Sequence, residues 1–551
     1  LSAYSQHGRC LDTLICFDRM QCESISPNAV TFVYILKACG SIGSLKNGRS
    51  VHARIIKDNH LGCNVFVGTS MLDMYAKCGE LAMAQKEFDF LQYHDLVSWN
   101  AVMHGYSLYG HVKEAYACFE RMQCEAQFPN SVTIVCMLRA CIAVGALDRG
   151  KIIHSRIVGH ELPPSLGSAL VDMYVKCGNL EKAEEVFREI NVRNVVCWTA
   201  LLAGYTQHGQ GEEALNCFEQ MQREGISPSA VTYVCILKAC GSIRALEKGK
   251  IVHADIVREG LLVKNVLVGN ALVDMYAKCG SLKKAHEVFN ELHVRDVISW
   301  NAIITGFTRL GHWEEVMNYF EQMQHEGLHP DHCTFFAILR VCGSIGAIER
   351  GTEAHNMIVH EGLLEKDISI GNALVDMYAK CGALTKAQEV FNKLPVPNVV
   401  SWTGLISGYA QLGKDVTVVK LFNKMIQEGI RPNVVTFTVM LNACRHSGLL
   451  HKGDMYFDAM YTQYGVIPTM EHNTCMVDLF GRAGQFDKAV SLIKRIPNSD
   501  CLPIWTTLLG ACQTWRNLTL GRQAFEHAVR LNEMDDAMYI CMSNIYVAGS
   551  M

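Results

Sequence analysis

Hydrophobic residues in this chain recur at helical spacing over short segments that end at glycine or proline. Within residues 297–331, one such segment covers 300–309 and is followed by Gly311, a residue type common at helix ends. A second amphipathic segment covers 313–324, and Pro330 follows it. The pattern therefore predicts two short helices joined by a tight turn.

The same pair of helices is predicted many times along the chain. One phrase returns every 99 to 102 residues as SWNAVMHGY, CWTALLAGY, SWNAIITGF and SWTGLISGY, with Trp99, Trp198, Trp300 and Trp402. Cysteine returns at the same period, at Cys39, Cys141, Cys240, Cys342 and Cys444. One period holds three sub-units of 35, 36 and 31 residues, at 297–331, 332–367 and 368–398. Hairpins this short bury their apolar faces only by stacking, so we predict an all-α fold, a right-handed α-solenoid (superhelix) of helix-turn-helix repeats.

The composition and net charge of the chain argue against several classes of protein and of binding site. The chain has 551 residues, too many for one compact core, and a formal net charge of -4, which argues against a uniformly cationic nucleic-acid binder. No apolar run reaches the ~18 residues of a membrane-spanning helix, so no membrane partner is expected. The 24 cysteines include no CxxC pair, so the cysteine column is predicted to pack as small buried side chains, and neither a metal nor a cofactor is expected.

The phrases VVSWTGLISGYAQLG, LVDMYAKCG and LVSWNAVMHGY, with the closing EG-x-x-P-N/D, resemble pentatricopeptide repeats. The rotation of 35, 36 and 31 residues resembles the plant-type subclass of standard, long and short motifs. Tetratricopeptide repeats have a similar period of ~34 residues, but this chain does not keep their Trp-Leu-Gly-Tyr pattern. The resemblance implies an array at 1–433 with a truncated first motif, the last long and short motifs at 434–500, and a truncated E-like helical extension at 501–551. Because the chain opens at Leu1 within a predicted helix, we interpret it as a fragment without its targeting segment.

The resemblance implies that each standard or short motif contacts one RNA base with two polar side chains, one on its first helix and one at its last residue. The nine pairs in this sequence are Thr69 with Asp95, Asn100 with Asn130, Ser168 with Asn194, Thr199 with Ser229, Asn270 with Asp296, Asn301 with Asp331, Asn372 with Asn398, Thr403 with Asn433, and Thr474 with Asp500. By the family code the RNA would be G, pyrimidine, gap, A, undetermined, gap, U, U, gap, pyrimidine, A, gap, G, from 5′ to 3′. Thr199 with Ser229 departs from that code.

Cations follow the base-recognition position in steps of four residues, one step later in long motifs and two steps later in short motifs, which places them on the same helix face. The nine are Lys37, Lys77, Arg139, Lys176, Lys238, Lys278, Arg340, Lys380 and Arg482. We expect them to line one ribbon and contact RNA phosphates. In short motifs an aspartate lies midway between the recognition residue and the cation. The alternative role of the cation is therefore an i,i+4 ion pair with this aspartate, worth ~0.2–0.5 kcal/mol, and this role is compatible with phosphate binding.

Two further columns flank the predicted pairs. Long motifs carry apolar residues at the base-recognition position, which should space or stack bases without discriminating them: Val33, Val135, Val234 and Phe336. Val97, Val196, Ile298 and Val400 are expected either to sandwich bases or to join the core. The polar pairs themselves should be exposed, although Asn or Asp after Pro is also favourable chemistry for a helix N-cap.

No catalytic constellation is evident, so no enzyme is predicted. The single HxE, at 312–314, has no CxxC partner, and no phosphate-binding loop is present. The resemblance implies sequence-specific binding of single-stranded RNA in a mitochondrion or chloroplast, as a specificity factor for C-to-U editing that works with a deaminase-domain protein or other editing factors. The alternatives are an RNA stabilisation, processing or splicing factor, or a peptide-binding helical scaffold.

Overall fold

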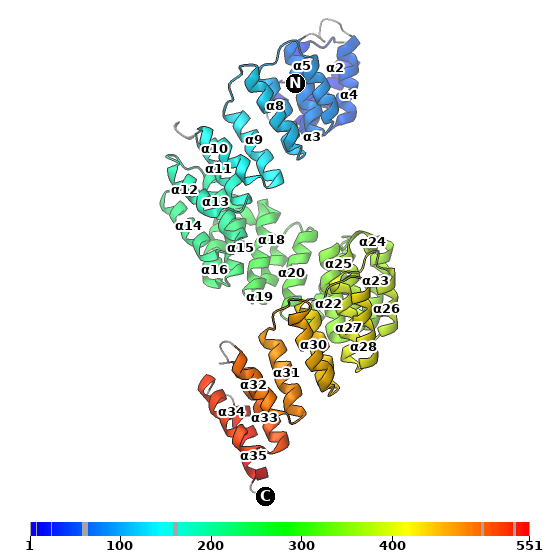
Figure 1. Ribbon diagram of the computed structural model, residues 1–551. Helices are drawn as coiled ribbons and strands as arrows, with labels where there is room; N and C mark the ends of the chain where they lie inside the picture. Colours follow the sequence, from blue (N-terminus) through cyan, green and yellow to red (C-terminus); the bar gives the residue numbers. More distant parts are fainter. Residues whose placement is uncertain are drawn as a thin grey trace. The chain divides into compact units, whose positions relative to one another are not determined.

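The computed structural model describes residues 2–6, 8–23, 25–57, 64–157, 163–496, 501–532 and 536–549. All secondary structure in these segments is helical, which confirms the predicted fold class (Figure 1). The chain divides into two units, Leu1–His293 and Val294–Met551, and each is described by itself.

The first unit contains nineteen of the described helices. They are α1 (Ser2–Gln6), α2 (Cys10–Cys22), α3 (Ala29–Ile42), α4 (Leu45–Lys57), α5 (Val65–Lys77), α6 (Leu81–Phe90), α7 (Leu96–Leu108), α8 (Val112–Cys124), α9 (Ser131–Val144), α10 (Leu147–Ile157), α11 (Pro164–Lys176), α12 (Leu180–Glu189), α13 (Val195–Gln207), α14 (Gly211–Arg223), α15 (Ala230–Ser242), α16 (Leu246–Arg258), α17 (Leu261–Lys264), α18 (Val266–Lys278) and α19 (Leu282–Glu291).

The second unit continues the same alternation. Its helices are α20 (Val297–Arg309), α21 (Trp313–His325), α22 (His332–Ile345), α23 (Ile348–His360), α24 (Leu363–Lys366), α25 (Ile368–Lys380), α26 (Leu384–Lys393), α27 (Val399–Gln411), α28 (Asp415–Gln427), α29 (Val434–His446), α30 (Leu450–Thr462), α31 (Met470–Arg482), α32 (Phe486–Arg495), α33 (Leu502–Trp515), α34 (Leu518–Leu531) and α35 (Asp536–Gly549).

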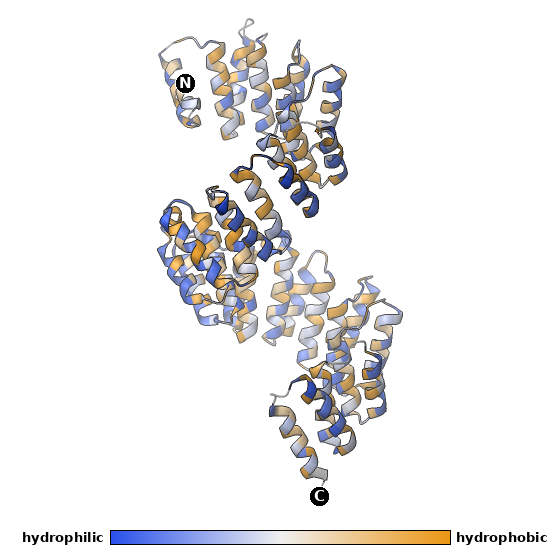
Figure 2. Cartoon of the chain, turned by 90° about the vertical axis from the view of Figure 1, so that its left-hand side faces the viewer, coloured by the Kyte–Doolittle hydropathy of each residue, from blue (hydrophilic) through white to orange (hydrophobic). Residues whose placement is uncertain are grey.

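The first helix of each hairpin packs on the first helix of the next hairpin. In the first unit this row runs from α3 through α5, α7, α9, α11, α13 and α15 to α18, and in the second from α20 through α22, α25, α27, α29 and α31 to α33. The second helices form the other layer, and both layers carry apolar and hydrophilic stripes along their helices (Figure 2). The first helices of each unit therefore present one continuous row of side chains.

Aromatic packing joins neighbouring hairpins. Trp99, Trp198, Trp300 and Trp402 are all buried. Trp99 meets Phe88 of the preceding short motif edge to face, with ring centroids 4.6 Å apart, and Trp402 meets Phe391 in the same way at 4.6 Å. A tryptophan that fills the junction between two hairpins explains why it returns once per period.

The cysteine column is buried as predicted: Cys39, Cys141, Cys240, Cys342 and Cys444. Burial raises the pKa of the Cys39 thiol to about 11 and that of Cys240 to about 12. These thiols are therefore protonated near neutral pH, which suits packing better than nucleophilic chemistry.

The predicted helix bounds need one correction. The helix expected at 300–309 begins at Val297, because Asp296 caps it and its side chain accepts a hydrogen bond from the Ser299 N–H. Gly311 follows the helix with φ +79°, where a residue without Cβ is least strained. In the described segments, no helix combines the length and apolar character needed to cross a bilayer.

Candidate nucleic-acid interface

Three hollows open along the row of first helices. In the first unit, one of about 680 Å³ is lined by Thr69, Asp95 and Asn100 of the predicted pairs, and one of about 530 Å³ is lined by Ser168, Thr199 and Ser229. In the second unit, a hollow of about 830 Å³ is lined by Asn372, Asn398, Thr403 and Asn433. Spacing along the sequence thus places most of the predicted base-recognition residues along these hollows.

Predicted phosphate contacts line the same hollows. Lys37, Lys77 and Arg139 border the first, Arg139 and Lys176 the second, and Arg340 and Lys380 the third. Other predicted residues do not line these hollows: Asn130, Asn194, Asn270, Asp296, Asn301, Asp331, Thr474, Lys238, Lys278 and Arg482. Asn270 lies in the first unit and Asp296 in the second. Asp500 lies outside the described residues.

The last residue of a motif caps the first helix of the next motif. The Asn130 Oδ1 accepts from the Thr133 N–H at 3.0 Å, and the Asp331 Oδ1 accepts from the Thr334 N–H at 3.0 Å. The expectation of N-cap chemistry is therefore confirmed. A backbone N–H is a fixed donor, so it fixes which way the capping oxygen points.

Several predicted pairs meet in the folded chain. The Asn301 Nδ2 donates to both carboxylate oxygens of Asp331 at 2.9 Å. The Asn100 Nδ2 donates to Asn130 Oδ1, and the Asn372 Nδ2 donates to Asn398 Oδ1, each at the longer distance of 3.4 Å. In each pair the first-helix amide turns its nitrogen toward the capping oxygen.

Asp331 is held in its charged form by these contacts. Burial alone would raise its pKa, but the Thr334 N–H, the Asn301 amide and the Thr334 hydroxyl all donate to the carboxylate and lower the pKa below its ordinary value. Asp331 therefore offers only hydrogen-bond acceptors to a ligand, whereas Asn130 in the same role also offers an amide N–H.

The expectation that all the recognition side chains are exposed is wrong for three of them. Ser168, Asn270 and Thr403 are only 8%, 5% and 8% exposed, because they lie in the junction between adjacent first helices. Ser168 and Thr403 still line the second and third hollows. Asn130 is exposed, and most of the others are half-buried. The predicted ribbon is therefore a row of recessed polar sites.

The nine cations divide into two groups. In every short motif the cation pairs with the aspartate four residues earlier: Lys77 with Asp73 at 2.7 Å, Lys176 with Asp172 at 2.9 Å, Lys278 with Asp274 at 2.6 Å, Lys380 with Asp376 at 2.6 Å, and Arg482 with Asp478 at 3.0 Å. The long-motif cations are exposed and form no ion pair with any described residue: Lys37, Arg139, Lys238 and Arg340. The ion-pair alternative is confirmed for the short motifs only.

The residues three positions before the recognition residue are exposed, so the alternative that they join the core is wrong, and the alternative that they sandwich bases stays a prediction. Val97 is 62% exposed, Ile298 57% and Val400 56%. Val97, Val196 and Val400 border the first, second and third hollows. Each hollow therefore has both apolar and polar lining residues, which suit the face and the edge of a base respectively.

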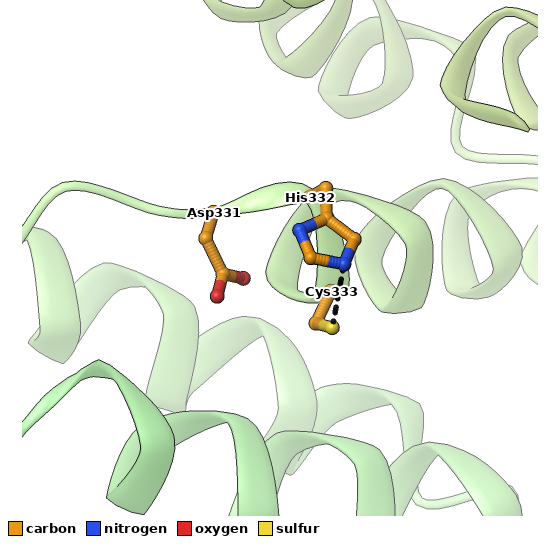
Figure 3. Close-up of side chains that lie close together, drawn as sticks. All are labelled: Asp331, His332 and Cys333. Carbon is orange, nitrogen blue, oxygen red and sulfur yellow. Dashed lines mark hydrogen bonds between the residues drawn. The ribbon is translucent and has the colours of Figure 1, made fainter. Parts of the chain in front are cut away.

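One cluster resembles a metal site. The ligand atoms of Asp331, His332 and Cys333 lie within 4.8 Å of one another. Figure 3 shows the His332 ring and the Cys333 sulfur side by side, with the Asp331 carboxylate near them. The His332 Nε2 and the Cys333 Sγ lie 3.3 Å apart. The carboxylate is already engaged by Asn301 and Thr334. His312 of the HxE sequence lies 3.5 Å from Glu315.

The structure adds side chains that the sequence analysis missed. The third residue of several first helices donates a hydroxyl hydrogen bond to the recognition residue of the preceding motif, as Thr133 does to Asn100 at 2.7 Å. The sequence carries this signal as a Ser or Thr three residues after several of the caps. It was hidden because the same residue completes a capping box.

Comparisons with known proteins agree with this architecture. The model of the PPR repeat family matches residues 94–143, 193–242, 295–344 and 397–446. The model of the PPR repeat matches residues 168–195, 270–297, 372–396, 435–462 and 474–501. The model of the pentatricopeptide repeat domain matches residues 1–41. A chloroplastic pentatricopeptide repeat-containing protein of Arabidopsis thaliana is 35% identical over 97% of this chain and 66% of its own length. A mitochondrial one is 33% identical over 100% of this chain and 79% of its own length. The chain thus spans between about two thirds and four fifths of these relatives.

A solved structure shares the fold. The pentatricopeptide repeat protein PPR10, in complex with an 18-nt psaJ RNA element, superposes with a TM-score of 0.61 at 18% identity over 99% of this chain and 81% of that one. Another crystal structure, of PPR10 from maize, superposes with a TM-score of 0.53 at 17% identity over 100% of this chain and 90% of that one. With repeats matched along its length and relatives this similar, the chain belongs to the pentatricopeptide repeat family.

Proposed function

We propose that this chain binds single-stranded RNA in a sequence-specific manner, with one base at each polar pair and the phosphates along the long-motif cations. The observation that carries the proposal is the third hollow, where two polar pairs, the exposed Val400 and the unpaired Arg340 line one cavity. Base faces, base edges and phosphates each find a matching surface there. The RNA complex of the structurally similar PPR10 supports the same ligand class.

Within that function, we favour a specificity factor for C-to-U RNA editing in a mitochondrion or chloroplast. The support is the rotation of standard, long and short motifs, with the C-terminal hairpins α33–α34 in the place of an E-like extension. Relatives named chloroplastic and mitochondrial support an organellar location. The deaminase activity would come from a partner protein or from another part of the full-length protein. An RNA stabilisation or processing role uses the same interface.

The test is a competition between two RNAs of equal length and composition. One carries the predicted order of bases, and the other carries the same bases permuted. We expect the predicted order to bind at least 10-fold more tightly in a filter-binding or fluorescence-anisotropy titration, because each mismatched base at a specific site costs ~1–3 kcal/mol. Equal binding of the two RNAs would contradict sequence specificity, and absence of binding to both would contradict the proposal as a whole.

A further inference from the structure

The recognition residue of one motif and the third residue of the next first helix change character together at most junctions. A polar third residue follows a polar recognition residue in Asn100 with Thr133, Thr199 with Thr232, Asn301 with Thr334, Asn372 with Ser401, and Thr403 with Thr436, and in Thr438, at the same position of the last long motif, with His472. Ser168 with Cys197 and Thr474 with Ile504 do not follow this correspondence. Where it is apolar, the third residue is apolar: Val33 with Val67, Val135 with Leu166, Val234 with Val268, and Phe336 with Ile370. The capping box alone does not require this correspondence.

Direct hydrogen bonds account for the polar cases. The hydroxyl of Thr133 donates to Asn100 Oδ1 at 2.7 Å, that of Thr334 to Asn301 Oδ1 at 2.6 Å, and that of Ser401 to Asn372 Oδ1 at 2.6 Å. The Thr199 and Thr232 hydroxyls lie 2.8 Å apart, as do those of Thr403 and Thr436. The contact recurs in both units with nearly constant geometry.

The direction of each hydrogen bond follows from the helix backbone. The Thr334 Oγ1 accepts the Asp331 N–H at 3.3 Å, and its single proton has two acceptors within reach, Asn301 Oδ1 at 2.6 Å and Asp331 Oδ1 at 3.1 Å. The proton therefore points mainly toward the nearer acceptor, Asn301 Oδ1. Asn301 Oδ1 is then occupied, while one N–H of its amide serves the Asp331 carboxylate. The remaining amide N–H is left for a base acceptor.

A threonine at the recognition position takes the opposite hydrogen-bonding role to an asparagine and presents an acceptor. The Thr199 hydroxyl donates to the Val195 carbonyl at 2.7 Å. Its contact with Thr232 must then be donated by Thr232, whose oxygen accepts from the Ser229 N–H at 3.0 Å. The free lone pair of Thr199 is left for a base donor. Asparagine therefore presents a donor and threonine an acceptor, each fixed by the third residue.

We propose that the third residue of these first helices is a specificity-determining positioning residue, because its hydroxyl fixes whether the recognition side chain presents a donor or an acceptor to RNA. The inference rests on the proposed RNA-binding function and deepens it. It adds a third side chain to the polar pair at the junctions where the contact forms. The contact is missing at the Thr69 junction, where Ser98 donates to the Asp95 carbonyl at 2.8 Å and the buried Thr69 hydroxyl has no hydrogen-bond partner. Base discrimination there should be the weakest of the described polar junctions.

The test uses Thr334→Val, which keeps the shape of the side chain and removes the hydroxyl. The measured quantity is the ratio of dissociation constants for RNAs with A or U at the eighth position, the base assigned to Asn301 and Asp331. A general loss of affinity or stability leaves this ratio unchanged. We expect the preference for U to fall roughly 3- to 10-fold, the worth of one hydrogen bond, and Thr334→Ser to restore it.

Thr308→Val is the matched control, because the buried Thr308 hydroxyl donates only to the Ile304 carbonyl on the same helix as Asn301. Thr133→Val, tested with purine or pyrimidine at the second position, repeats the experiment in the first unit and decides the matter if Thr334→Val does not fold. An unchanged ratio in the folded variants would overturn the inference while leaving RNA binding intact. A wild-type chain with no base preference at either position would instead contradict the proposed function.

Discussion

The long and the short motifs of this chain place different chemistry at equivalent positions of the first helix. Four long motifs have an apolar recognition position and an unpaired cation four residues later, as in Val135 and Arg139. A short motif has a polar recognition position and a cation held by an aspartate, as in Ser168 and Lys176. On the proposed function, we infer from this difference that these long motifs attract the phosphate backbone and the short motifs discriminate bases.

Removing the four unpaired cations should reduce RNA affinity more than any other change proposed below. The variant carries Lys37→Gln, Arg139→Gln, Lys238→Gln and Arg340→Gln. Because each phosphate contact to a single strand contributes ~0.7 to the salt slope, the slope of log K against log salt should fall by about 2.8, and affinity at 0.1 M salt should fall roughly 10²- to 10³-fold.

The matched control replaces four whole ion pairs, with Asn for the aspartate and Gln for the lysine, at Asp73 with Lys77, Asp172 with Lys176, Asp274 with Lys278 and Asp376 with Lys380. It leaves net charge unchanged and should alter the slope little. Equal losses in the two variants would contradict this difference between long and short motifs.

Freeing the paired lysines should have the next largest effect. Asp73→Asn, Asp172→Asn, Asp274→Asn and Asp376→Asn together remove four negative charges beside the recognition row. The lysines become available to phosphates, so we expect affinity to rise roughly 10-fold at 0.1 M salt and the salt slope to steepen. Isothermal titration at three salt concentrations measures both. Weaker binding would show that the aspartates themselves contact RNA.

Changing a cap should alter base preference without loss of stability. Asp331→Asn keeps an N-cap of similar strength but adds an amide donor beside Asn301. We expect the preference for U over C at the eighth position to fall roughly 3- to 10-fold, with the melting temperature almost unchanged. A large fall in melting temperature with base preference retained would assign Asp331 to folding alone.

The smallest effect concerns pH at the junctions between long and short motifs. His154, His253 and His355 each contact a tyrosine hydroxyl of the next short motif, at 2.9, 2.9 and 3.0 Å. Burial lowers the pKa of all three histidines. The unfolded chain therefore takes up protons near pH 6.5 that the folded chain resists, so their contribution to stability is complete above about pH 6.5 and declines as pH falls.

We expect the melting temperature to drop on the order of a few degrees between pH 7.5 and 5.5. His253→Gln retains a hydrogen-bonding side chain that does not titrate, and it should reduce this drop. A drop of the same size in a variant with all three histidines replaced by glutamine would assign the pH dependence to other groups.

The fold was largely predictable because each hairpin repeats the same turn residues and apolar spacing, as in 300–309 and 313–324. For the candidate interface, the sequence predicted which positions carry polar residues and cations, but not which of them form ion pairs or hydrogen bonds with each other. A spacing of four fits equally well an ion pair and a free cation, and it did not distinguish Lys176 from Arg139. The hydroxyl of Thr334 was missed because its role in the cap and its contact with Asn301 require the same residue type, and only the packing of adjacent helices brings the two together.

In the proposed function, the recessed polar row recognises bases in a fixed order. Selection of bound RNA from a random pool of single strands tests it without prior choice of a sequence. We expect enrichment of two adjacent uridines, with adenine three positions before the first and three positions after the second. Enrichment of unordered composition alone, or no enrichment above the starting pool, would contradict it.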